Sequence, residues 1–161
     1  MFKRPSLSPE QALQKLRHYC GYQERSHQEV REKLYSFGLR KNDVESAIAT
    51  LISEDQLNEE RFAMEFAGGH FRLKHWGKIK IRYELKGKGV SDYCVMKALA
   101  AIDETDYARA LSDQAARKWE SLAGESNQFS RRQKVRDYLL QKGYESDRIN
   151  AVVNSIAGGA S

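Results

Sequence analysis

The most concentrated chemistry in this sequence is the positive charge of residues 70–88. This segment holds seven lysines and arginines and a single acid, Glu84, whereas the rest of the chain carries 20 basic and 21 acidic residues. Ammonium and guanidinium groups at this density attract phosphates or a carboxylate-rich surface, with an affinity that falls as salt rises. The segment therefore predicts a partner-binding face, made of Arg72, Lys74, Lys78, Lys80, Arg82, Lys86 and Lys88.

A second, shorter basic cluster lies near the C-terminus and contains Arg131, Arg132 and Lys134. In one interpretation it extends the binding face, and in the other it is a solvated helix surface, which is the usual role of a charge run. Both interpretations of this cluster stay open. For residues 70–88 we favour binding, because the charge there is so unbalanced.

Three aromatic residues interleave the basic segment, namely Phe71, Trp76 and Tyr83. Aromatic rings between cations can stack on nucleic-acid bases or anchor in a protein pocket. Burial in the core is nevertheless the simpler expectation for each ring, with Trp76 the most open case.

Catalytic signatures are missing from the sequence. The four histidines include no His-x-x-x-His pair, and neither HExxH nor a nucleophile elbow occurs. Cys20 and Cys94 lie 74 residues apart without a CxxC motif, which disfavours a disulfide framework or a zinc ribbon. No transmembrane segment or secretory signal is recognised. We expect a non-enzymatic protein of the reducing cytoplasm that uses no metal or cofactor.

The elements that position these residues come from an internal repeat. Gly38, Gly89 and Gly143 each end the frame [Val/Ile]-Arg-x-x-Leu-x-x-x-Gly-apolar, at spacings of 51 and 54 residues. The apolar residue and the leucine four positions later share one helical face. The glycine then follows where a helix ends in a left-handed residue. Each frame therefore predicts a helix that a glycine of positive φ terminates.

Each frame is followed by a second amphipathic pattern and preceded by another, which predicts three helices per repeat. The expected fold is all-α, with nine helices in three tandem three-helix repeats at residues 7–57, 58–104 and 105–157, and a disordered tail at 158–161. A single repeat buries little surface, so neighbouring repeats should pack in series. We favour an elongated, curved row of repeats over one compact bundle.

One arginine recurs in every frame, as Arg31, Arg82 and Arg136. Recurrence in all repeats follows the fold better than it follows a single binding site. We therefore favour a structural arginine, with its stem packed and its head bonded inside its own unit.

With the repeat and the basic segment established, the chain resembles the RecX family, bacterial regulators of the RecA recombinase, over nearly its whole length. The strongest similarities are residues 26–34 with Gly38, residues 57–63, and residues 77–90. The last stretch has a glycine, basic residues, an acidic–leucine pair and a Lys-Gly-hydrophobic ending. Two departures stand out. Gly68-Gly69 replace better helix formers, and His75-Trp76 replace basic or small residues before Gly77.

The resemblance implies an all-helical triple repeat that lies along the groove of the RecA–DNA filament. There it would restrain strand exchange, ATP hydrolysis and coprotease action by bridging protomers and competing for DNA-facing surface. It also implies a part in recombination, DNA repair and the SOS response. We expect a monomer without a membrane partner, and the ten basic residues named above are the candidate contacts to RecA or DNA.

The alternative is a protein that binds single- or double-stranded DNA directly, through helix-turn-helix-like units. Reading bases in the major groove requires suitable side chains at the start of a recognition helix. The third helices of the repeats are expected to begin at 42–43, 92–93 and 147–148, where acidic residues dominate. Sequence-specific reading is therefore disfavoured, while nonspecific binding through the middle repeat stays open.

Overall fold

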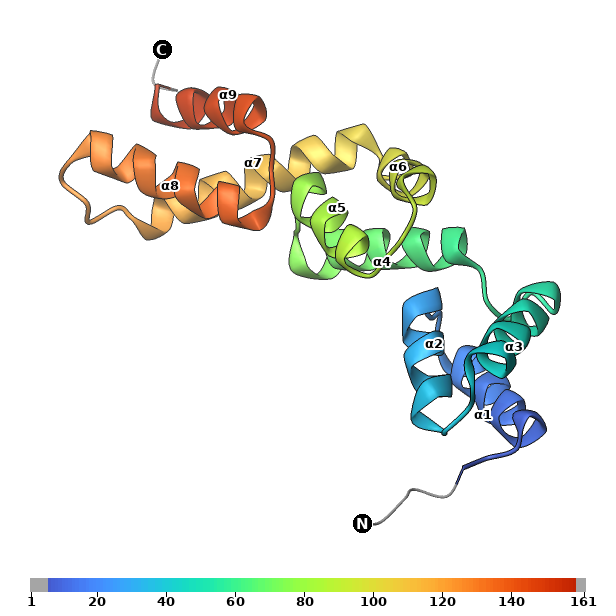
Figure 1. Cartoon of the computed structure of the whole chain (residues 1–161). Coiled ribbons are helices and arrows are strands. Elements are labelled where there is room, and N and C mark those ends of the chain that lie inside the picture. Colours follow the sequence, from blue (N-terminus) through green and yellow to red (C-terminus); the bar gives the residue numbers. More distant parts are fainter. Residues whose placement is uncertain (1–5, 159–161) are drawn as a thin grey trace, which may run out of the picture. The chain divides into compact units, whose positions relative to one another are not determined.

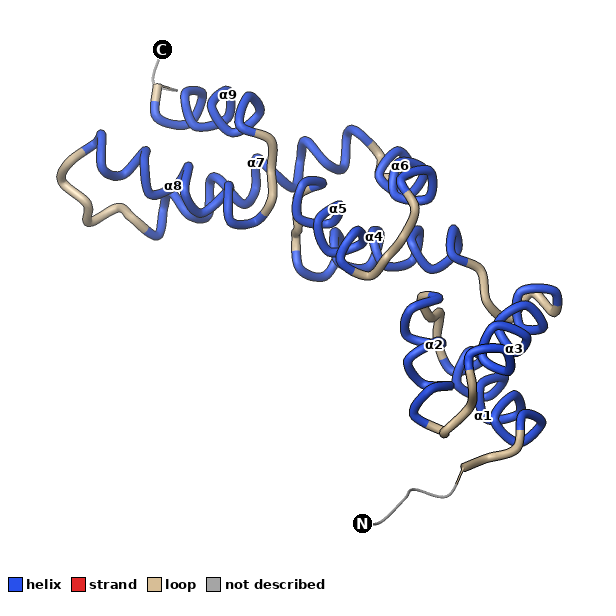
Figure 2. Tube along the Cα trace, viewed as in Figure 1, coloured by secondary structure: helices blue, strands red, loops and turns tan. Residues whose placement is uncertain are grey.

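The computed structural model describes residues 6–158, and this part of the chain is entirely helical (Figures 1 and 2). The prediction of an all-α fold with nine helices and no strand is confirmed for these residues. Residues 159–161 of the predicted disordered tail lie outside them. The helices are α1 (Pro9–Tyr22), α2 (His27–Ser36), α3 (Lys41–Ser53), α4 (Glu59–Lys74), α5 (Lys78–Gly87), α6 (Asp92–Ala100), α7 (Glu104–Ser121), α8 (Gln128–Lys142) and α9 (Ser146–Ala157).

The chain divides into two compact units. Unit 1 contains Met1–Glu65 and Leu85–Lys97, and unit 2 contains Phe66–Glu84 and Ala98–Ser161. Helices α4, α5 and α6 contribute residues to both units. The repeat boundaries proposed from the sequence stay predictions.

Polar side chains start several of the helices by bonding amides that a helix leaves unpaired. Ser8 and Gln11 form a reciprocal capping box at α1, with N–H···O distances of 3.2 and 3.0 Å. Ser26 accepts from the amide of Glu29 at 3.0 Å and begins α2. Such caps typically contribute about 1 kcal/mol each.

The three frame glycines lie just past helix ends and have positive φ, as predicted. The angle is +85° at Gly38, +79° at Gly89 and +97° at Gly143. The amide of Gly143 donates to the carbonyl of Leu140 at 3.0 Å, so the turn also pairs a carbonyl from the last turn of α8. Only glycine adopts this left-handed conformation without steric cost from a Cβ.

The core of unit 1 contains the apolar stripes of α1, α2 and α3. Leu16, Leu34 and Leu51 come from three different helices and have no exposed surface. Burying a leucine in this way contributes roughly 2 kcal/mol, less the entropy of ordering it. In unit 2, α7, α8 and α9 pack on one another in the same manner (Figure 1).

The turn between α4 and α5 docks on the end of α8 through backbone hydrogen bonds within unit 2. The amide of Gly77 donates to the carbonyl of Lys142 at 2.7 Å, and the amide of Ile79 donates to that of Gly143 at 2.9 Å. A Cβ on Gly77 would lie 2.3 Å from the carbonyl group of Gly143. A Cβ on Gly143 would lie 2.3 Å from the Cβ of Lys80 and 2.6 Å from its backbone nitrogen. Both positions therefore need glycine for the two backbones to approach.

Two buried tyrosines hold the same turn. The Tyr144 hydroxyl donates to the carbonyl of His75 at 2.9 Å, and the amide of Lys78 donates to the Tyr107 hydroxyl at 2.9 Å. Tyr107 in turn donates to Glu145. His75 itself ends α4 with φ of +58°, a left-handed conformation in which histidine is tolerated better than most side chains. The turn is thus fixed from both sides.

Gly143→Ala should destabilise the protein far more than Gly89→Ala. Both changes place a Cβ on a left-handed residue, which costs about 1 kcal/mol. At Gly143 the new atom also meets the Lys80 backbone nitrogen at 2.6 Å, whereas no described atom lies within 4 Å of a Cβ at Gly89. Denaturant unfolding should show a loss of roughly 1 kcal/mol for Gly89→Ala and of roughly 3 kcal/mol or more for Gly143→Ala. Equal losses would contradict the close backbone contact.

Candidate functional site

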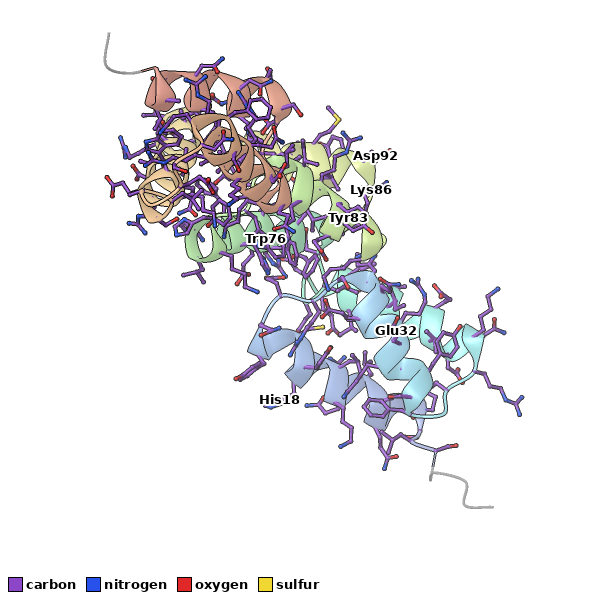
Figure 3. The ribbon with its side chains drawn as sticks, turned by 90° about the vertical axis from the view of Figure 1, so that its left-hand side faces the viewer. His18, Glu32, Trp76, Tyr83, Lys86 and Asp92 are labelled. Carbon is purple, nitrogen blue, oxygen red and sulfur yellow. The ribbon has the colours of Figure 1, made fainter. Side chains whose placement is uncertain are left out.

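Four side chains of unit 2 gather where Gly77 meets Gly143, and we call them the cationic junction. Lys74 is the last residue of α4, and Lys80 lies in the first turn of α5. Lys142 is the last residue of α8, and the fourth member, Trp76, lies in the docked turn (Figure 3). Three lysines from three helices therefore meet because the two backbones dock.

Two of the lysines lie over the indole ring of Trp76, which is half-buried. The ammonium of Lys80 lies 4.7 Å from the ring centroid, and that of Lys74 lies 5.5 Å away. His70 stacks on the indole at 4.4 Å between centroids. The ammonium of Lys142 donates to the carbonyl of Lys74 at 2.7 Å. Cation–π contacts and stacking thus order a positively charged, aromatic patch.

Partial burial and a neighbouring like charge both act on Lys142 in the junction. Partial burial lowers the pKa of the Lys142 ammonium, and the neighbouring positive charge of Lys80 lowers it further. Both effects disfavour the charged form, whereas the negative charge of an anion bound here would favour it. The junction can therefore bind an anionic group.

Two other predicted residues of unit 2 lie apart from the junction. The ammonium of Lys78 lies 4.7 Å from the ring centroid of Tyr107. The guanidinium of Arg72 folds back along α4, where it would lie 2.8 Å from a Cβ placed on Gly68. The role of these two residues in binding stays a prediction.

The recurring arginine has a structural partner in the first and third frames. Arg31 forms an ion pair with Glu45 at 3.0 Å. Arg136 donates to the side-chain oxygen of Asn150 at 3.2 Å. In both frames the head of the arginine is bonded to the helix that follows, as the structural interpretation expects.

The structural interpretation is wrong for Arg82, the arginine of the middle frame. The position that matches Glu45 and Asn150 is Met96 in this frame, and its side chain has no oxygen acceptor. Arg82 is exposed, and within residues 6–158 its guanidinium makes no hydrogen bond or ion pair. An anionic partner can therefore bind this guanidinium without breaking an internal contact.

The predicted lysines at the end of the basic segment belong to unit 1, and both are paired there. Lys86 forms an ion pair with Asp92 at 2.7 Å. Lys88 lies 3.8 Å from a carboxylate oxygen of Glu29. Exposed pairs of this kind contribute little to stability, but they lower the local positive charge.

Two residues of the second basic cluster make internal contacts at the end of α7 and just after it. Arg131 stacks on the ring of Trp119 at 3.6 Å and donates to its carbonyl at 2.7 Å. Lys134 pairs with Glu125 at 2.7 Å. The Nε of Arg132 is buried and has no hydrogen-bond partner among the described residues. For Arg131 and Lys134 these contacts favour the structural interpretation.

The three aromatic residues of the basic segment have three different environments. Phe71 is buried, as expected. The expectation of burial is wrong for Tyr83, which is 76% exposed, because Ile81 and Leu85 occupy the buried face of α5 (Figure 3). The exposed fraction of Trp76 lies between those of Phe71 and Tyr83.

Sequence reasoning missed three cations of unit 2, namely Lys142, Arg109 and Arg117. Lys142 directly precedes the frame glycine Gly143, so a docking role for that glycine would have identified it. The two arginines of α7 lie outside both basic clusters, and nothing in their local sequence marks them.

Other site types find no support in the described part of the chain. No group of three or more histidine, cysteine, aspartate or glutamate side chains there could hold a metal ion. None of the described helices has the length and hydropathy to cross a bilayer. Cys20 and Cys94 are buried free thiols.

The fold and the site define a helical repeat protein with a cationic, partly aromatic surface patch. The family model described as "RecX, second three-helix domain" matches residues 58–99, and "RecX, third three-helix domain" matches residues 104–153. The chain is 32% identical to the regulatory protein RecX of Prosthecochloris aestuarii, covering 90% of this chain and 93% of that one. It is 34% identical to the regulatory protein RecX of Salmonella typhimurium, covering 82% and 83%.

Solved structures agree on the fold. The crystal structure of RecX from Lactobacillus salivarius superposes with a TM-score of 0.83 at 22% identity, covering 92% of this chain and 96% of that one. A second crystal structure, of a regulatory protein RecX, gives 0.81 at 19% identity, covering 94% and 80%. The chain belongs to the RecX family of regulatory proteins.

The docked turn should make stability sensitive to alkaline pH through Tyr144. Burial raises the pKa of this hydroxyl from its ordinary value of 10.0 to about 12. Its contribution is fully present below pH 10, where both states hold the proton, and is lost as pH rises towards 12 because the unfolded state ionises first. The unfolding free energy should fall by about 1 kcal/mol more between pH 9 and 11 in the wild type than in Tyr144→Phe. Parallel pH curves for the two proteins would contradict the assignment.

Proposed function

We propose that this protein regulates the RecA recombinase by binding the RecA–DNA filament, and that its binding face includes the cationic junction and Arg82. Binding there restrains strand exchange, ATP hydrolysis and coprotease action by RecA. The proposal includes a non-enzymatic, monomeric protein of the cytoplasm. Membership of the RecX family supports the regulatory role.

The observation that carries the proposal is the closeness of Lys80 and Lys142. The docked backbones force two like charges together in a partly buried place, and this lowers the pKa of Lys142. Such an arrangement opposes stability in the free protein, because no acid of the described residues pairs with either ammonium. An anionic partner removes the repulsion, so the arrangement favours the bound state.

Direct binding to nucleic acid is the second candidate, and Trp76 favours it. A half-buried indole with two ammonium groups over its ring combines an aromatic surface with cations, the combination by which proteins bind single-stranded nucleic acid. The two candidates differ in whether RecA is required for tight binding. Variants of the binding face, measured with and without RecA, can therefore distinguish the two candidates.

Neutralising Lys80 and Arg82 together should weaken binding to RecA filaments on single-stranded DNA by about tenfold, which corresponds to about 1.4 kcal/mol. Charged contacts in the bound state are lost, while folding changes little since neither side chain has an acidic partner. Co-sedimentation and inhibition of RecA ATP hydrolysis would be measured across salt concentrations. The salt slope should fall by about one unit for each phosphate contact removed.

The matched control is Arg40→Gln with Lys41→Gln, two exposed cations of unit 1 that remove the same charge. Equal loss in both double variants, or no loss in either, would overturn the proposal. If only the Lys80→Gln/Arg82→Gln protein loses affinity, and loses it equally for DNA without RecA, direct nucleic-acid binding is the function.

The recurring arginine allows a comparison at one repeat position. Arg82→Gln should weaken filament binding without changing the melting temperature. Arg31→Gln should lower the melting temperature slightly, because it breaks the ion pair with Glu45, and should leave binding unchanged. Thermal melting and filament co-sedimentation of both variants test this directly. The opposite pattern, in which Arg31→Gln impairs binding as much as Arg82→Gln, would refute a special role for the middle frame.

A further inference from the structure

A pocket of about 240 Å³ opens in unit 2 between α4 and α7. Its charged and polar lining includes Arg72 and His75 from the end of α4, and Asp106, Arg109, Asp113 and Arg117 from α7. Three guanidinium groups thus converge on one cavity with two carboxylates. The pocket uses none of the residues of the cationic junction.

The arginines of this pocket are weakly neutralised. Arg109 lies 3.6 Å from Asp106, which is a loose ion pair on an exposed surface. Arg72 and Arg117 have no carboxylate within ion-pair distance among residues 6–158. At least two guanidinium groups are therefore available to a bound anion.

Arg72 is placed by a glycine in the interior of α4. Side chains of a helix point towards its N-terminus, so Arg72 lies back over Gly68, one turn earlier. A Cβ on Gly68 would lie 2.8 Å from the Arg72 Nη1 atom, whereas no described atom lies within 4 Å of a Cβ on Gly69. Gly68 thus leaves room for the guanidinium of Arg72, a residue that lines the pocket.

A buried amide completes the lining. Gln114 lines the pocket although only 6% of its surface is exposed. Its side-chain oxygen accepts from the Tyr138 hydroxyl at 3.0 Å, and its amide nitrogen makes no hydrogen bond with a described residue. This amide N–H is therefore available to donate to a molecule in the pocket.

We infer that this pocket binds a phosphate group. Guanidinium groups form paired hydrogen bonds to phosphate oxygens, and a phosphate offers enough oxygens to engage several arginines and an amide at once. A carboxylate has only two oxygens and would leave part of this donor set unpaired. The phosphate comes from a nucleic-acid backbone or from a free nucleotide, two sources with the same recognised chemistry.

Charge-changing variants of the full-length protein test the site in two directions. Arg109→Gln with Arg117→Gln should weaken phosphate binding at least fivefold, and Asp113→Asn should strengthen it at least twofold by removing a repelling carboxylate. The matched controls are Arg40→Gln with Lys41→Gln, and Glu32→Gln, which change the same charge in unit 1. A purely structural role for these residues would not produce effects of opposite sign.

Charge-neutral variants separate the site from general electrostatics. Gly68→Ala should weaken binding at least twofold, because the new methyl group displaces the Arg72 guanidinium. Gly69→Ala makes the same substitution one residue later in the same helix and should bind like the wild type. Melting curves of both variants would show that α4 is intact.

The probes are tripolyphosphate, a mononucleotide triphosphate and a fluorescent single-stranded oligonucleotide, measured without RecA by calorimetry and anisotropy. Effects on all three probes assign a free-phosphate site, and effects confined to the oligonucleotide assign a backbone-phosphate site. The inference is overturned if the wild type binds none of them, if pocket and control variants behave alike, or if a glutamate-rich peptide binds with equal affinity. RecA is absent from this assay, so it can fail independently of the proposed function.

Discussion

The contact on which unit 2 depends is the approach of two backbones at Gly77 and Gly143. Two hydrogen bonds close it. A Cβ on Gly77 would lie 2.3 Å from the carbonyl group of Gly143, and a Cβ on Gly143 would lie 2.3 Å from the Cβ of Lys80. The contact fixes where α5 begins and how it meets the end of α8. Lys80 and Lys142 are brought together as a consequence, and the hydroxyls of Tyr107 and Tyr144 find their backbone partners in the same turn.

The three repeat frames share one helical pattern, but the contacts of their glycines and arginines differ. A Cβ on Gly38 would lie 2.7 Å from Ser6, and a Cβ on Gly143 would lie 2.3 Å from the Cβ of Lys80. A Cβ on Gly89 would have no described atom within 4 Å. The arginines differ in the same way: those of the first and third frames bond to the helix that follows, whereas the arginine of the middle frame has no acceptor there. Contacts that the outer frames use for folding are thus left unsatisfied in the middle frame, which also carries the excess charge. This is the physical reason to place a binding face there.

Local sequence signals were sufficient to predict the helices, the left-handed glycines and the structural roles of Arg31 and Arg136, but not the unpaired side chain of Arg82. All three depend on neighbours within a few residues or on the repeat register. The close approach at Gly77 could not be predicted in the same way, because its partner lies 66 residues later and no periodicity connects them. The arginine pocket was missed for the same reason. Its cations come from α4 and α7, and only the tertiary fold brings them together.

The central claim is that backbone docking at Gly77 builds the cationic junction, and amide hydrogen exchange of Gly77 and Ile79 tests it most directly. These amides lie before and within the first turn of α5, where a helix supplies no partner and exchange is normally fast. Docking on α8 predicts protection as strong as that in the interior of α8, and its loss in Gly143→Ala. Exchange in the wild type as fast as that of Phe129, in the first turn of α8, would contradict the account.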